Sequence, residues 1–177
     1  GGPRLLAQGQ EQLVDGTRLA VLGFWEVAKQ FRFFRDLMKL SVNEIERRRP
    51  DCVVLVDYPG FNLRLAERIK HLGIPIIYYI SPQIWAWGGR RIEQIKRLVD
   101  LMLLILPFET DLYDQAGVAN EFVGHYLIED IPDEMVGSGP PAGGHLALLP
   151  GSRPQEIQRH LGPMLGAAVE FCRRHET

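Results

Sequence analysis

The sequence predicts an α/β protein built on an open parallel sheet. Short apolar or β-branched runs alternate with helical patterns, and short connections join them, which is typical of parallel strand–helix–strand units. The apolar runs are continuous rather than alternating, which favours strands covered on both faces. The 177 residues are enough for one full core with some chain left over.

The first part of the chain carries these signals in a regular order. The expected strands span residues 52–56, 75–80, 101–106 and 121–123. The expected helices between them span residues 61–72, 89–98 and 108–117. Gly73 and Gly117 mark the ends of the first and third of these helices.

A linker is expected at residues 132–144, where four glycines and three prolines occur within thirteen residues. The strand pattern then restarts at 145–149, followed by a tight turn and a helix at 154–174. We therefore expect a first domain at 1–131 and the beginning of a second at 145–177. Both ends read as cut, which indicates a piece of a longer protein.

Composition excludes several classes of function. The net charge of −2 gives no global attraction for nucleic acid. The two cysteines have no close spacing and indicate free thiols, and the five histidines show no ligand spacing, so no metal is expected. No secretory signal is visible, and the longest apolar run, 101–106, is far shorter than the roughly 20 residues that span a bilayer.

Ligands of open parallel sheets bind beyond the carboxyl ends of the strands. Asp57 stands at such an end, where a carboxylate is costly unless it has a function or a partner. One interpretation is a general base that takes a proton from an attacking hydroxyl. The alternative is that Asp57 caps the next helix or fixes the turn.

The segment 81–87 follows the second strand and contains two tryptophans, Trp85 and Trp87. They fit contact with an apolar substrate or a membrane interface, and equally fit packing between loop and sheet. Arg90 and Arg91 begin a basic helix beside this loop. Such a helix suits a phosphate-bearing ligand, and a solvated face is the alternative.

The segment 149–156 combines a sharp turn with a helix start. Gly151 permits the turn, and Ser152 with Gln155 matches a capping box. Backbone N–H groups at a helix N-terminus beside Arg153 predict phosphate binding, reinforced by the helix dipole. The alternative is a purely structural helix start, and the spacing is not that of a Walker A loop.

The segment 23–40 is amphipathic. On a helix, one face carries Phe24, Val27, Phe31, Phe34 and Met38, and another carries Trp25, Lys29, Arg32 and Lys39. Basic and aromatic residues together predict binding to an anionic lipid surface. The alternative is a helix packed on the sheet with its basic residues in water.

Several phrases of the sequence occur in a characteristic order: G-G-P-R at Gly1, L-G-F-W-E-V at Leu22, D-Y-P-G-F-N at Asp57, Y-I-S-P-Q-I-W-A-W at Tyr79, L-P-F-E at Leu106, G-H at Gly124 and L-P-G-S-R-x-x-E-I at Leu149. Together they resemble the lipid-A-disaccharide synthase family of glycosyltransferases, which has the GT-B architecture of two Rossmann-like domains. The resemblance covers nearly the whole chain, and W-A-W and L-P-G-S-R are its most specific phrases.

The resemblance implies an activity and its setting. The family transfers the sugar of UDP-2,3-diacylglucosamine to the 6-hydroxyl of 2,3-diacylglucosamine 1-phosphate, which gives the β-1,6 disaccharide phosphate and UDP. It implies a peripheral enzyme on an anionic membrane surface, at the cytoplasmic face of the inner membrane of Gram-negative bacteria. It also implies a full-length homodimer, an active site between the two domains, no cofactor and no nucleic-acid partner.

The resemblance also assigns residues. Asp57 and Arg153 match an aspartate and an arginine essential in the family, and we expect both to be catalytic. The expected substrate-binding residues are Phe61, Asn62, Ser81, Gln83, Trp85, Trp87, Arg90, Arg91, Glu109, His125, Gly151, Ser152 and Glu156. The expected membrane or acyl-chain residues are Phe24, Trp25, Phe31 and Phe34.

The chain departs from the family pattern at both ends. The family's opening strand with its G-E-T-S-G-D phrase is not present before Gly1, and most of the second domain is not present after Thr177. We therefore expect this chain alone to be inactive, with an exposed sheet edge. Two alternatives stay open, namely another GT-B UDP-sugar enzyme (a muropeptide GlcNAc transferase or an epimerase) and a non-catalytic lipid- or nucleotide-binding module.

Overall fold

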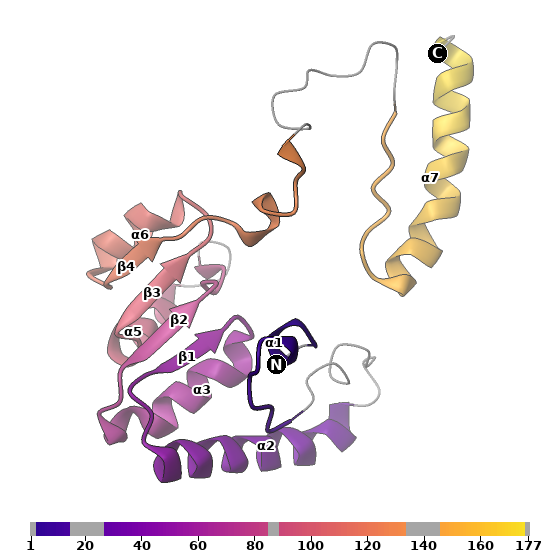
Figure 1. Ribbon diagram of the computed structural model, residues 1–177. Helices are drawn as coiled ribbons and strands as arrows, with labels where there is room; N and C mark the ends of the chain where they lie inside the picture. The colour runs from indigo at the N-terminus through magenta and orange to yellow at the C-terminus, as the bar shows by residue number, and fades with distance from the viewer. Residues whose placement is uncertain (1–2, 15–26, 85–88, 134–145, 176–177) are drawn as a thin grey trace. The chain divides into compact units, whose positions relative to one another are not determined.

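The computed structural model describes residues 3–14, 27–84, 89–133 and 146–175 (Figure 1). The chain divides into two units, residues 1–126 and 127–177. The sheet lies in the first unit, and the long helix α7, Pro154–His175, lies in the second. The predicted linker falls almost entirely outside the described residues, so the predicted domain boundaries stay predictions.

A four-stranded parallel sheet with the strand order β1-β2-β3-β4 forms the centre of the first unit. Its strands are β1 (Val53–Val56), β2 (Ile76–Tyr79), β3 (Leu101–Leu104) and β4 (Asn120–Phe122). Each strand pairs with the next one in the sequence. The predicted α/β class and open parallel sheet are confirmed.

The helices that connect the strands also match the sequence pattern. They are α3 (Pro59–Ile69) with the 3-10 turn η3 (Lys70–Leu72), α5 (Gly89–Leu98) and α6 (Glu109–Ala116). Gly73 and Gly117 end two of them with φ of 69° and 66°. These left-handed values are ones that glycine adopts without a steric penalty, so both glycines act as predicted.

Three elements differ from the prediction. The helix α1 (Pro3–Ala7) and the 3-10 turn η4 (Tyr126–Ile128) were not expected. The helix α2 (Val27–Arg48) continues well past residue 40. It does so because the apolar stripe continues: Met38 is buried, and Val42 and Ile45 pack against the core at helical spacing.

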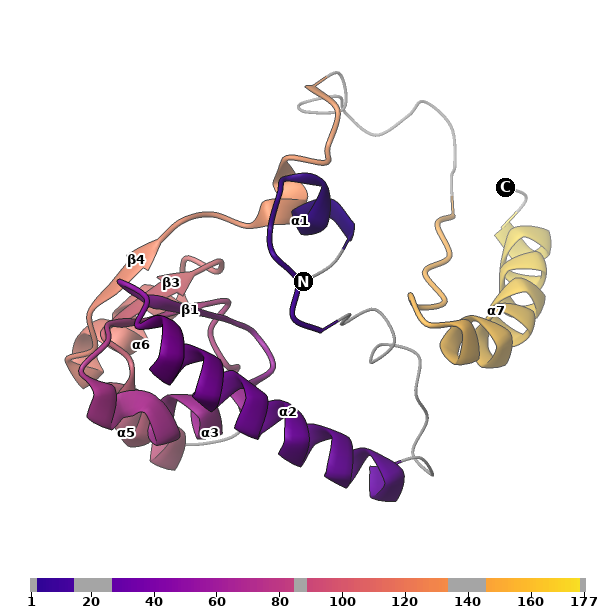
Figure 2. The same cartoon turned by 60° about the horizontal axis from the view of Figure 1, so that its bottom comes forward.

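One face of the sheet carries the core of the first unit. The helices α3, α5 and α6 lie in contact in that order, and α2 packs on the outside of α3 (Figures 1 and 2). Five strand side chains that point to this face are buried: Leu55, Ile76, Tyr78, Met102 and Leu104. The helices cover them with residues such as Ala66, Ile69 and Ile95, which are completely buried.

The opposite face of the sheet corrects a prediction. Val54 and Val56 are about half exposed, and Ile77, Tyr79, Leu101 and Leu103 are only partly buried. The expectation that both faces are covered is therefore wrong for the described residues. Each crossover joins neighbouring strands in the same direction, and right-handed crossovers of this kind place all their helices on one face.

The second unit contains α7 close to where the sequence predicts it, but no strand before it in the described residues. Residues 146–150 have no regular structure, so the prediction of a strand at 145–149 is not supported there. A strand exists only through hydrogen bonds to a neighbouring strand, and the described part of the second unit contains no such neighbour. An apolar run alone does not supply that partner.

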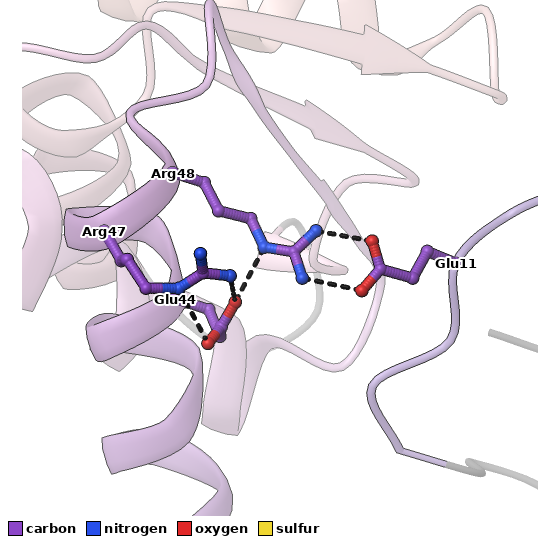
Figure 3. A network of polar contacts seen from close by, with 4 residues as sticks. All are labelled: Glu11, Glu44, Arg47 and Arg48. Carbon is purple, nitrogen blue, oxygen red and sulfur yellow. Dashed lines mark hydrogen bonds and ion pairs between the residues drawn. The ribbon is translucent and has the colours of Figure 1, made fainter.

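A chain of ion pairs joins the N-terminal segment to the end of α2 (Figure 3). The two Nη atoms of Arg48 lie 2.6 Å from the carboxylate oxygens of Glu11, and its Nε lies 2.7 Å from Glu44. Arg47 also bonds to Glu44, at 2.7 Å. Hydrogen bonds from Arg47 and Arg48 lower the pKa of Glu44 to about 2.

We expect the substitution Arg48→Gln to release the segment around α1, because it removes both bonds to Glu11. Hydrogen exchange at the amides of Gln8, Gly9 and Gln10, which bond to carbonyls of residues 5 and 6, should become faster. Arg35→Gln is the matched control, because the ion pair that Arg35 makes within the described residues is to its neighbour Asp36. Unchanged exchange in the Arg48 variant would contradict this role.

Acid should have the same effect as the substitution. The bonds from Arg48 lower the folded-state pKa of Glu11, so its contribution is complete above the ordinary value of 4.5 and is lost as the pH falls below it. Glu44, whose pKa is lowered to about 2, loses its contribution later in the same acid range. The pairs are exposed, so salt should weaken them too. Exchange at the same three amides, taken relative to the rate of an unfolded chain at each pH and measured at low and high salt, checks both effects.

Candidate functional site

Three polar residues gather where the strands of the sheet end. Asp57 follows β1, Ser81 follows β2 by two residues, and Glu109 begins α6 after β3. Because the strands are parallel, these positions share the carboxyl edge of the sheet. This edge is the candidate site in the first unit.

The main chain of Asp57 is held from two sides. Its N–H donates to the carbonyl of Tyr79 at 2.9 Å, which extends the pairing of β1 with β2 by one residue. Its carbonyl accepts bonds from the Tyr78 hydroxyl at 2.7 Å and from the Asn62 amide at 2.6 Å. Asp57 itself has φ of 48°, a left-handed conformation in which aspartate is more common than most residues.

The carboxylate of Asp57 faces solvent, and none of the ion pairs among the described side chains uses it. The helix α3 begins after Tyr58 without a side-chain cap, and Pro59 suits its first turn. The alternative interpretation of Asp57 as a helix cap is therefore not what the structure shows. Its main chain fixes the turn while its carboxylate stays available.

Two predicted substrate-binding residues support this turn instead of facing outward. The side-chain amide of Asn62 also donates to the Val56 carbonyl, at 3.0 Å. Phe61 is half-buried, and its ring lies 6.3 Å from that of Phe34 on α2. Phe34 in turn stacks on Tyr58 with ring centroids 5.9 Å apart, so α2 contacts the Asp57 turn.

Ser81 and Glu109 bind each other. Both are buried, and the Ser81 hydroxyl donates to a Glu109 carboxylate oxygen at 2.5 Å. Burial raises the pKa of the nearby Tyr113, and the charge of Glu109 raises it further. Ile80, just before Ser81, has φ of 66°, which is strained for a β-branched residue. The pair links the loop after β2 to the start of α6 at the carboxyl edge of the sheet.

The basic helix lies at the same edge. Arg91 is exposed on α5, and its charge acts on Tyr78: burial and the charge of Asp57 raise the pKa of Tyr78, whereas Arg91 lowers it. Arg91 and Asp57 therefore both lie within electrostatic reach of the Tyr78 hydroxyl. Arg90 lies in α5 with only its backbone described, and Trp85 and Trp87 fall outside the described residues.

The remaining predicted residues of the first unit lie apart from one another. Gln83 is exposed in the loop after β2. His125 stacks on Tyr126 with ring centroids 4.9 Å apart, beyond the end of β4. Among the described residues, no group of three or more histidine, cysteine or acidic side chains lies close enough to hold a metal ion.

The turn before α7 is closed by Glu156. One carboxylate oxygen of Glu156 accepts from the N–H groups of Ser152 at 3.3 Å and Arg153 at 3.2 Å. The other accepts from the Arg153 guanidinium at 2.8 Å, and this bond lowers the pKa of Glu156. The capping-box pattern predicts that Gln155 accepts the bond from the Ser152 N–H. In the structure Glu156, one position further along the helix, accepts it.

The donors that the sequence analysis assigns to a phosphate are occupied by Glu156 in the structure, and phosphate binding stays a prediction. A carboxylate already lies against two backbone N–H groups and a guanidinium at a helix start, which is the arrangement predicted for a phosphate. Gly151 makes the turn possible with φ of 113°. In the sequence, the signal for this contact is the acidic residue in the first turn of the helix, Glu156. The same residue is among the expected substrate-binding residues.

The amphipathic segment is only partly described. Phe24 and Trp25 fall outside the described residues, and Phe31 lies in α2 with only its backbone described. Phe34 is half-buried against Tyr58 and Phe61, whereas Phe33, which the sequence analysis did not single out, is exposed. No described helix is both long and apolar enough to cross a membrane.

Two tyrosines of the site were missed by sequence reasoning. Tyr58 joins the turn to α2, and Tyr78 bonds the Asp57 carbonyl from a completely buried position. The signal for Tyr78 was a pair of hydroxyl-bearing residues, Tyr78 and Tyr79, inside an otherwise apolar strand. Such a residue needs a hydrogen-bond partner when it is buried.

Comparison with known proteins gives a consistent result. The family model described as "Lipid-A-disaccharide synthetase" matches residues 1–177. The chain is 46% identical to the lipid-A-disaccharide synthase of Myxococcus xanthus and to that of Nitrosococcus oceani, over 95% and 94% of its length. It is also 46% identical to lipid-A-disaccharide synthase 1 of Legionella pneumophila, over 95% of its length. The chain spans about half the length of these relatives, 45–46%.

We expect the substitution Gly151→Ala to open the turn before α7. A Cβ there would lie 2.7 Å from Oε2 and 2.9 Å from Cβ of Glu156, and the φ of 113° is strained for alanine. The strain is of order 1–3 kcal/mol. Hydrogen exchange at the amides of Ser152 and Arg153 should become faster.

The control for this prediction is Gly162→Ala in the same helix. A Cβ at Gly162 meets nothing within 4 Å, and alanine stabilises a helix interior by roughly 1 kcal/mol relative to glycine. This variant should leave exchange at Ser152 and Arg153 unchanged or slower. Faster exchange in both variants, or in neither, would show that Gly151 does not set the turn.

Proposed function

The chain belongs to the lipid-A-disaccharide synthetase family, and from this premise we propose that it is part of the glycosyltransferase that joins the two sugars of lipid A. The whole enzyme transfers the sugar of UDP-2,3-diacylglucosamine to 2,3-diacylglucosamine 1-phosphate. The first unit of this chain handles the acceptor, and the second begins the nucleotide-sugar domain. The observation that carries this proposal is the anchored Asp57 turn with its exposed carboxylate.

Asp57 acts as the general base in this proposal. Its carboxylate takes the proton from the acceptor 6-hydroxyl, and that oxygen attacks C1 of the donor sugar opposite the leaving group. The new C1–O bond forms as the bond from C1 to UDP breaks, so the configuration at C1 inverts and gives a β-1,6 link. An exposed carboxylate on a fixed main chain at the carboxyl edge of a parallel sheet supports this role.

Arg153 and the turn before α7 stabilise the leaving diphosphate. As the bond to UDP breaks, negative charge develops on the diphosphate oxygens, and cationic and N–H donors fixed in advance lower the energy of that state. The observed contacts to the Glu156 carboxylate support the capacity of this turn for an anion. Gly151 and Ser152 contribute the turn itself.

The acceptor's phosphate and acyl chains account for the rest of the proposed site. Arg91, with Arg90 before it, offers cations near the carboxyl edge for the 1-phosphate. The Trp85 and Trp87 loop and the aromatic residues of segment 24–34 provide apolar surface for acyl chains. Contacts within the protein stabilise the carboxyl edge itself, and they come from Ser81, Glu109, Asn62 and Phe61.

The membrane surface is the proposed location. Diacylated sugars reside in a bilayer, so the enzyme has to meet them there, on the cytoplasmic face of the inner membrane. Exposed Phe33 and Leu40 beside exposed Arg32 and Lys39 on α2 support attraction to an anionic surface. We also propose that the full-length protein is a homodimer, as the resemblance implies.

We expect Asp57→Ala and Arg153→Ala each to lower turnover by about a hundredfold or more, through loss of the base and of charge stabilisation. The measurement uses a full-length enzyme in which residues 1–177 replace the matching segment of the Myxococcus xanthus relative. Product formation from the two acylated sugars is followed. Unacylated UDP-sugars, tested alongside, separate this activity from that of other UDP-sugar enzymes.

The matched controls remove a carboxylate and a guanidinium at positions outside the proposed site. Asp51→Ala deletes an exposed aspartate at the opposite end of β1, and Arg173→Ala deletes an exposed arginine that pairs with Glu170 as Arg153 pairs with Glu156. Both controls should keep near-normal turnover. Near-normal turnover in Asp57→Ala or Arg153→Ala would refute the role assigned to that residue.

We expect Trp25→Glu combined with Phe31→Glu to weaken binding of the 177-residue chain to liposomes that contain anionic lipid. The added negative charges oppose both burial in the interface and attraction to the surface. Sedimentation with the liposomes measures the bound fraction. Val54→Glu combined with Val169→Glu, two exposed apolar residues outside this segment, is the charge-matched control. Equal binding by both double variants would refute the proposed membrane role of the segment.

A further inference from the structure

We propose that Tyr78 and Asn62 are positioning residues that hold the main chain of Asp57 in its left-handed conformation and so aim its carboxylate. This inference rests on the proposed role of Asp57 as the base. The two residues donate to one acceptor, the Asp57 carbonyl, at 2.7 Å and 2.6 Å. Neither side chain needs to touch a substrate for this role.

The need for such support comes from the backbone. Asp57 and Tyr58 have φ of 48° and 45°, two successive residues other than glycine in the left-handed region. Such residues cost free energy and persist only where the surroundings determine them. The Asp57 N–H is fixed by the Tyr79 carbonyl, so the hydroxyl and the amide fix the other side of the same residue.

Tyr78 suits this task because the core packs around it on all sides. It lies in β2 and is completely buried between neighbours in the core, with its hydroxyl reaching the carboxyl edge of β1. Asn62, on the first turn of α3, adds a second donor and also bonds the Val56 carbonyl. The turn is thus tied to a rigid strand and to a helix, while the carboxylate remains in solvent.

The rate depends on the position of a general base as well as on its presence. Proton transfer requires the carboxylate to be within hydrogen-bond reach of the acceptor hydroxyl, and a small displacement costs rate. Loss of either donor would let the left-handed turn relax. The carboxylate would still be there, but its time in the productive position would fall, which lowers kcat with little effect on KM.

Two measurements test the proposal. In the 177-residue chain, the ¹³C shifts of the Asp57 Cα and Cβ report its backbone conformation, and Tyr78→Phe and Asn62→Leu should each move them. In the full-length chimera, each variant should lower kcat by about tenfold and leave the KM of both substrates as in the parent. Tyr113→Phe is the structural control, because Tyr113 is equally buried and no described hydrogen bond joins it to the Asp57 turn.

The outcomes separate this proposal from the proposed function. If both variants leave the Asp57 shifts and kcat unchanged, or if Tyr113→Phe moves the Asp57 shifts as far as Tyr78→Phe does, the positioning role is wrong. If Tyr78→Phe does not fold, Asn62→Leu decides by the same criteria. If Asp57→Ala keeps normal turnover, the base assignment fails, whereas the shift measurement still tests whether the two residues hold the turn.

Discussion

The bonds that continue the pairing of β1 and β2 beyond the last residue of β1 are the constraint on which the site depends. They link the Asp57 N–H to the Tyr79 carbonyl and the Asp57 carbonyl to the Tyr78 hydroxyl. Because both groups on β2 belong to a strand whose inner face is completely buried, the position of Asp57 is set by the core of the first unit. The start of α3 and its contact with α2 through Tyr58 follow from that position.

Three residues at the carboxyl edge of the sheet have a strained backbone. Asp57, Tyr58 and Ile80 all have positive φ, each at a cost of order 1–3 kcal/mol. Hydrogen bonds of about 1 kcal/mol each offset only part of this cost, so the packed core contributes the rest. Strain of this kind is commonly kept where a protein needs a side chain in one place, and here it lies beneath the exposed carboxylate of Asp57.

Most of the fold was predictable because periodicity and glycine positions report local structure directly. The parallel order followed from apolar runs, and the ends of η3 and α6 followed from Gly73 and Gly117. Coverage of the second sheet face and a strand at 145–149 were not predictable, since both depend on partners that the local pattern does not reveal. The same holds for the candidate site. Asp57 was predictable from its place after a strand, but the supporting role of Asn62 and Tyr78 was not, because it depends on contacts between elements.

The turn before α7 already holds an anion, the Glu156 carboxylate. On the proposed function, a diphosphate that enters the turn displaces this carboxylate, as well as water, from the N–H groups of Ser152 and Arg153. A singly charged anion would gain little by such an exchange, whereas a multiply charged one would gain Coulomb energy. The proposed site would therefore select anions of high charge density, and the bond to Glu156 would hold the Arg153 guanidinium in place before they bind.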